Sequence, residues 1–206
     1  MTDAALAVAR EQLRRMRGMT ALYHRRFFAD IWLTMVTYLA VLTAGHLGAE
    51  PMFATLAFVA LFGAVVTAFD ASYLIFARHY AARLESYINR RLDEEILVGG
   101  RLEETYLFPL NTRKIVTIGV GSGFSWFGFM TAFFTSLGAA GYALGVTLAL
   151  QTLESGVTIF LYATVLGLLT VMALAAGIWW FVAGTGEARL DAILGEVFEE
   201  PSPHGG

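Results

Sequence analysis

The sequence contains no cysteine, and only 15% of its 206 residues are charged. Without cysteine the chain cannot form disulfides, zinc–thiolate sites or iron–sulfur clusters. Soluble domains carry about 25% charged residues, so the shortage of charge argues against an ordinary soluble fold. The net charge of −3 gives no electrostatic reason to expect a nucleic-acid partner.

The sequence also lacks the motifs of the common enzyme classes. It has no H-E-x-x-H, no phosphate-binding loop with its lysine and no dinucleotide fingerprint, and no nucleophile–base pair stands out. The polar stretch between the second and third apolar runs has about 37 residues, and with two short tails it is too small for a catalytic domain. We therefore expect no enzymatic activity, no metal site and no cofactor.

Long apolar runs are what the sequence has in abundance. Four runs alternate with short polar segments, and they cover residues 31–45, 52–77 (interrupted by Asp70), 115–150 and 157–183. About 20 apolar residues in a helix cross a bilayer. We predict an all-α integral membrane protein with four transmembrane helices in two antiparallel hairpins, at about residues 30–48, 51–78, 114–137 and 157–183.

The third run is too long for one ordinary span. Gly138 and Gly141 stand where it could break. Either the span ends near residue 137 and an outer loop follows, or one long helix continues to about residue 150. We favour the long helix, kinked between the two glycines.

The basic residues are distributed very unevenly around these runs. Of the 14 arginines and lysines, six precede the first run, seven lie between the second and third, and one follows the fourth. Segments 46–51 and 151–156 contain none. Because positively charged loops stay in the cytoplasm, this pattern predicts that both termini are cytoplasmic. The location is then the inner (cell) membrane, and the excess of Arg over Lys, with abundant Ala and Gly, favours a bacterial source.

The segments outside the spans have helical patterns of their own. No apolar stretch precedes the arginines of residues 1–26, so we expect no cleavable signal peptide there. The second span is expected to continue as one rod from Pro51 to about Leu97, because it carries an apolar stripe at spacings of four: Phe76, Tyr80, Leu84, Ile88 and Leu92.

An apolar stripe on a projecting helix needs a partner. The N-terminal helix, or the same helix of another subunit, could cover it; the N-terminal helix could instead lie on the membrane face. The expected divisions are a basic N-terminal helix at 1–29, a membrane domain at 30–183 that includes a cytoplasmic helical segment at 79–113, and a C-terminal tail at 184–206. A cytoplasmic protein is a candidate partner at residues 79–108.

The stretch "TIGVG" at residues 117–121 resembles the selectivity filter of potassium channels in its letters alone. A filter needs an apolar pore helix entering from the outer side, whereas "PLNTRK" precedes this stretch. A phosphate cradle would need a preceding strand or a following Lys and Ser/Thr. Small residues four apart more simply predict close helix packing, and the positions are Gly119, Gly123, Gly141 and Gly145. The same span is the most polar one, so a pore-lining role is the alternative.

Two acidic residues are expected within or at the edge of the membrane. Asp30 and Asp70 each stand 20 residues from Glu50 in the connection of the first hairpin, so two antiparallel helices hold them at similar depth. One interpretation is local neutralisation by neighbouring basic residues, such as Arg26. The other is a cation or proton site at the cytoplasmic mouth, because intramembrane carboxylates usually face the bundle interior or water. Three tryptophans are predicted interfacial anchors: Trp32, Trp179 and Trp180.

Two functions follow from these features. The first is a small oligomeric, channel-like protein that conducts cations or protons and carries a cytoplasmic helical stalk. The alternative is a non-enzymatic accessory or assembly subunit of a larger membrane complex. The partners expected are the lipid bilayer and further copies of the chain or other membrane subunits.

Overall fold

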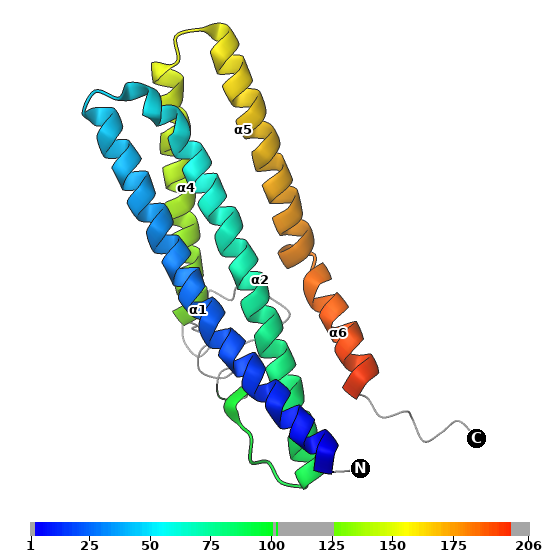
Figure 1. The fold of residues 1–206 in the computed structure, drawn as a ribbon. Helices are drawn as coiled ribbons and strands as arrows, with labels where there is room; N and C mark the ends of the chain where they lie inside the picture. The colour runs from blue at the N-terminus through cyan, green and yellow to red at the C-terminus, as the bar shows by residue number, and fades with distance from the viewer. Residues whose placement is uncertain (1–2, 101, 103–125, 199–206) are drawn as a thin grey trace.

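The computed structural model describes residues 3–100, 102 and 126–198, and all regular structure in these ranges is helical (Figure 1). The elements, in chain order, are α1 (Asp3–His46), the 3-10 turn η1 (Glu50–Met52), α2 (Phe53–Leu92), α4 (Trp126–Thr152), α5 (Gly156–Gly177), the π-helical turn η2 (Ile178–Val182) and α6 (Thr185–Phe198). The links from α1 to α2 and from α4 to α5 lie at the same end of the molecule, called here the connection end (Figure 1).

Four of the described helices are long and apolar enough to cross a membrane, and they cover Leu6–His46, Glu50–Leu92, Phe129–Thr152 and Gly156–Val182. The predicted all-helical fold with four candidate spans is confirmed at this level. Helix α4 continues without interruption through Gly138 and Gly141 to Thr152, which corresponds to the longer of the two expected forms of the third span. The first residues predicted for that span, 114–125, lie outside the described residues.

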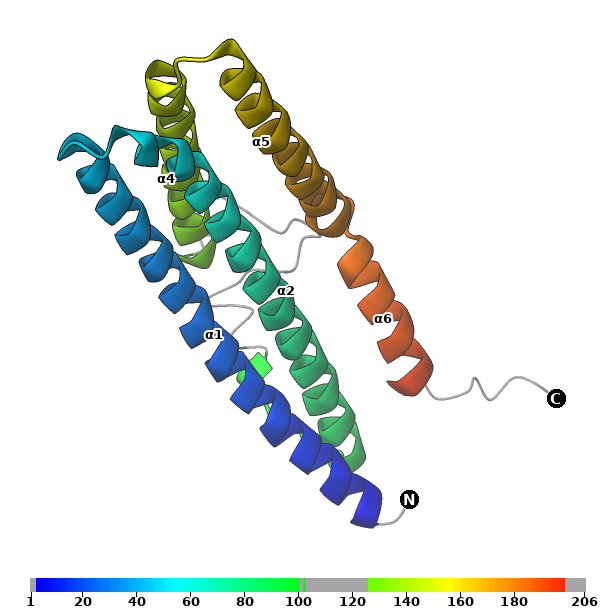
Figure 2. The ribbon, with the colours of Figure 1, turned by 45° about the horizontal axis from the view of Figure 1, so that its top comes forward.

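Helices α1 and α2 are antiparallel and lie side by side over most of their length (Figures 1 and 2). Small residues allow the close approach: a Cβ on Gly45 would overlap the ring of Phe53, and a Cβ on Gly63 would overlap the side chain of Thr34. Since lipid provides little hydrophobic drive for helices to associate, contact through such positions is what holds membrane helices together.

The pair continues beyond the length that a bilayer requires, and an apolar core forms there. Three residues of α1 pack against three of α2, and the core consists of Ala9, Leu13, Met16, Ala81, Leu84 and Ile88. Leu84 and Ile88 are each 1% exposed. Burying a side chain of this size contributes about 1.5–3 kcal/mol. The partner of the predicted stripe is therefore the N-terminal part of α1, which forms one helix with the first apolar span instead of a separate helix over residues 1–29.

Helix α2 ends at Leu92, five residues before the predicted end near Leu97. Asp93 adopts a left-handed conformation with φ of 51°, which stops the helix. The Asn89 side chain then donates to the carbonyl oxygen of Leu97 at 2.7 Å and accepts from its N–H at 2.9 Å. These two bonds turn the chain back along α2. The apolar pattern of the sequence therefore extends to Leu97, although the helix itself ends at Leu92.

The most enclosed candidate span is α2, with 28% of its apolar window buried against 11% for the third span. Helices α1, α4, α5 and α6 all contact it. Within the described residues of a single chain, α2 is therefore more enclosed than the third span. The reason is topological, because α2 follows α1 in the chain and also receives α4.

Helices α5 and α6 occupy the edge of the bundle. Among the described side chains of α5 only Leu166 is buried. The segment predicted as a plain tail begins with α6, which contacts α2: Leu190 and Leu194 are buried, and Asp191 lies 3.6 Å from Arg83.

Candidate functional site

The two carboxyl groups expected at similar depth lie together between α1 and α2. Asp70 is 2% exposed, and its carboxyl group lies close enough to that of Asp30 to interact with it directly. Two ionised carboxylates this close repel each other, since each can only accept a hydrogen bond. The pair is therefore a concentration of negative charge that a bound cation or a proton would relieve. Chain spacing predicted the common depth, and the packing of α1 on α2 decides that the groups face each other.

One oxygen of this pair is unsatisfied within the described part of the chain. Asp70 Oδ2 is buried and has no hydrogen-bond partner there. Buried polar atoms almost always have a partner, and an unpaired one costs roughly 1–3 kcal/mol, more when charged. An oxygen in this condition is suited to accept a ligand that brings positive charge or a hydrogen-bond donor.

Arg26 is a cation that lies near the pair. It stands one helical turn before Asp30 on α1, and it attracts the Asp70 carboxyl electrostatically. Its guanidinium lies 5.9 Å from the ring centre of Tyr23, which stacks on Tyr73 at 4.8 Å. Among the described residues neither carboxyl forms an ion pair within 4.0 Å. The interpretation of local neutralisation is therefore supported only by the longer-range attraction of Arg26.

A second buried carboxylate lies nearer the other end of α2, and it was not anticipated from the sequence. Glu85 is 4% exposed. Its Oε1 accepts from Arg17 at 2.5 Å and its Oε2 accepts the backbone N–H of Gly100 at 2.7 Å. The sequence did contain a signal for it: Glu85 directly follows Leu84, so its carboxylate lies at the edge of the apolar stripe that packs against another helix. This group joins α1, α2 and the chain after α2, and its role is structural.

The predicted packing glycines differ in what surrounds them. A Cβ on Gly145 would lie 2.6 Å from the backbone nitrogen of Ala57, so α4 reaches the backbone of α2 at this point. Gly141 accepts a hydrogen bond from the Tyr38 hydroxyl at 2.7 Å through its carbonyl oxygen, which ties α4 to α1. Gly119 and Gly123 lie outside the described residues.

The three predicted anchor tryptophans lie at helix surfaces. Trp32 is 64% exposed and Trp179 is 51% exposed. Arg189 lies over the Trp179 ring at 5.2 Å, and Trp180 is half-buried against Gly186, where a Cβ would come within 2.7 Å of its ring. Their interfacial role stays a prediction.

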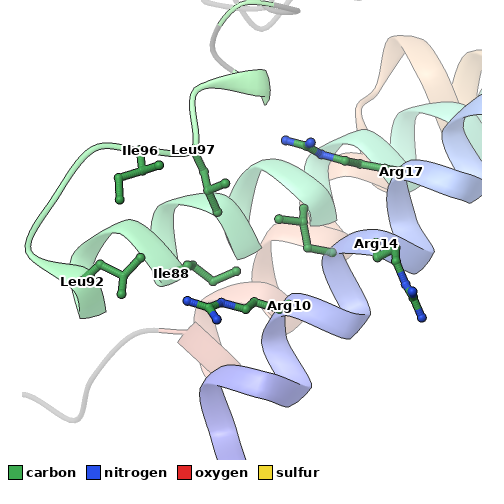
Figure 3. Close-up of a pocket in the computed structure, with 8 residues that line it drawn as sticks. Arg10, Arg14, Arg17, Ile88, Leu92, Ile96 and Leu97 are labelled. Carbon is green, nitrogen blue, oxygen red and sulfur yellow. The ribbon is translucent and has the colours of Figure 1, made fainter. Parts of the chain in front are cut away.

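A pocket of about 410 Å³ lies where the far ends of α1 and α2 meet the chain after α2 (Figure 3). Its floor is apolar and its edge is basic, and the lining residues are Leu13, Ile88, Leu92, Ile96 and Leu97 with Arg10, Arg14 and Arg17. Arg17 is paired with Glu85, and Arg14 points away from the pocket towards its partner Glu11, at 2.8 Å.

Within residues 3–100, 102 and 126–198 there is no group of three or more His, Cys, Asp or Glu side chains that could hold a metal ion. No protein-family model, curated protein or solved structure matches this chain. The fold and the site together support a helical, multi-pass membrane protein with an acidic pair enclosed between its first two long helices.

Proposed function

We propose that the protein conducts a small cation or protons across the membrane and that the Asp30–Asp70 pair is the binding site on the way. The observation that carries the proposal is Asp70: 2% exposed, facing a second carboxyl group, and with one oxygen unpartnered among the described residues. Ionisable groups within membrane helices are costly and are retained chiefly where they bind or transfer ions.

The arrangement across the membrane follows from the arginine distribution. Both termini and the far ends of α1 and α2 face the cytoplasm, so these ends form a cytoplasmic stalk and the acidic pair lies at the inner mouth. Four helices seldom enclose a wide pore, so the conducting path lies where copies of the chain meet. The apolar windows of α4 and α5 support this, because only 11% and 6% of them are buried in the single chain.

Flux into liposomes tests the proposal. Wild-type protein reconstituted with a potassium gradient and a pH-sensitive dye should carry a current of cations or protons, and Asp70→Asn should abolish it without changing the assembly. Glu154→Gln is the matched control, because it neutralises an exposed carboxylate in the link between α4 and α5. Equal flux through wild type and Asp70→Asn would refute the proposal.

An accessory subunit of a larger complex is the second candidate, and the pocket at the end of the stalk favours it. Its apolar floor offers a partner contact beyond the membrane (Figure 3). The mass of the detergent-solubilised protein separates the two functions: a defined homo-oligomer supports conduction, and a monomer that co-purifies with other membrane subunits supports the accessory role.

A further inference from the structure

A second unsatisfied oxygen lies on α4 at the level of the acidic pair. Helices α2 and α4 are antiparallel neighbours, and they touch where Gly145 meets Ala57 (Figures 1 and 2). We count thirteen residues from this contact away from the connection end. On α2 the count leads from Ala57 to Asp70, and on α4 it leads from Gly145 to residue 132. Because every helical residue rises about 1.5 Å, Thr131 stands within one residue of the level of Asp70.

Thr131 also lies on the face of α4 that meets α2. It precedes Gly145 by fourteen residues, which is close to four turns of about 3.6 residues. Both threonine and glycine therefore occupy nearly the same side of the helix. In both views the end of α4 farther from the connection end lies behind the α1–α2 pair (Figures 1 and 2).

The hydroxyl of Thr131 differs from those of several other threonines in the long helices. A helical threonine commonly donates to the carbonyl four residues earlier, and three do so here at 2.7 Å: Thr34, Thr67 and Thr170. The Thr131 Oγ1 atom is buried without a hydrogen-bond partner among the described residues. Two buried, unsatisfied oxygens at one level, Asp70 Oδ2 and Thr131 Oγ1, point to a ligand between them.

We infer that Thr131 completes the Asp30–Asp70 site as an oxygen ligand and that the site takes a small monovalent cation such as Na⁺. Oxygen atoms replace the hydration shell of such ions in membrane proteins. Two carboxyl groups and one hydroxyl supply few oxygen ligands, which suits a monovalent ion, whereas a divalent ion prefers more carboxylates than the described residues bring together here. This inference rests on the proposed function, because it names the ligand class of the same site.

Thermal unfolding in detergent measures cation binding without requiring conduction. The probe is sodium chloride, exchanged for N-methyl-D-glucamine chloride at constant ionic strength, because a ligand that binds the folded state raises the melting temperature. Sodium should stabilise the wild type, and Asp70→Asn should lose the effect. Thr131→Val should raise the half-saturating sodium concentration about 10- to 150-fold, because it removes one oxygen that contacts a charged group. Thr131→Ser keeps the hydroxyl and should titrate like the wild type.

The outcomes separate this inference from the proposed function. If Thr131→Val titrates like the wild type while Asp70→Asn loses the sodium effect, the role of Thr131 is refuted and conduction stands. If sodium leaves the wild type unchanged, sodium binding is refuted, and the flux assay alone decides whether other cations or protons pass. Should Thr131→Val fail to fold, Thr131→Ala replaces it in the comparison with Thr131→Ser, and equal titration of those two refutes the inference.

Discussion

Removing the Glu85 carboxylate should loosen the N-terminal part of α1 from α2. Glu85→Ala leaves the Gly100 N–H without its 2.7 Å acceptor and breaks the pair with Arg17. The Arg17 side chain is 51% exposed, so water can solvate its charge and the full penalty of about 3–5 kcal/mol for breaking a buried pair does not apply. The lost charged hydrogen bond costs about 1.5–3 kcal/mol, and the half-exposed pair adds about 0–1 kcal/mol.

The expected destabilisation is therefore about 1.5–4 kcal/mol for local opening of the pair. Limited proteolysis with trypsin reads this directly, because Arg10, Arg14, Arg15 and Arg17 lie in the segment that would open. When opening is rapid, the cleavage rate follows the open population, so cleavage after these arginines should rise about 10- to 1,000-fold. Glu85→Gln keeps an acceptor for Gly100 and should have a smaller effect.

The control is Glu11→Ala, which removes a carboxylate that is 64% exposed and paired with Arg14 on the same helix. A pair of this kind contributes about 0–1 kcal/mol, so cleavage should change little. The reasoning is refuted if Glu85→Ala and Glu11→Ala are cleaved at the same rate, since the buried carboxylate would then contribute no more than an exposed one.

Two further substitutions test how α4 is held. Gly145→Val should destabilise the protein by about 1–3 kcal/mol through overpacking, because a Cβ would lie 2.6 Å from the Ala57 backbone nitrogen. The control is Gly138→Val, which has open space around it and should melt near the wild type. Equal melting temperatures of the two variants would contradict the contact between α4 and α2. Tyr38→Phe removes the hydroxyl that donates to Gly141, so it should lower stability by about 0.6 kcal/mol, and no change in detergent unfolding would show that this bond is replaced.

The acidic pair illustrates how far chain spacing alone reaches. Equal distances from a short connection predict equal depth for Asp30 and Asp70, because helical rise is constant. Whether the two carboxyl groups face each other depends on the rotation of each helix about its axis. That rotation is set by the residues in contact between the helices, here Gly63 and Thr34, and no local sequence pattern encodes this contact. The sequence showed the third span only as the most polar one, and placing Thr131 at the level of Asp70 required the contact between Gly145 and Ala57.

The sequence by itself determined that the chain forms four long apolar helices and that the second continues past the length of a span, because hydrophobicity and helical period are properties of neighbouring residues. Only the tertiary structure decided that α1 covers the stripe of α2, that α2 stands at the centre, and that Asp93 and Asn89 end it at Leu92. Those outcomes depend on contacts between residues far apart in the chain, and such contacts leave no periodic trace in the sequence.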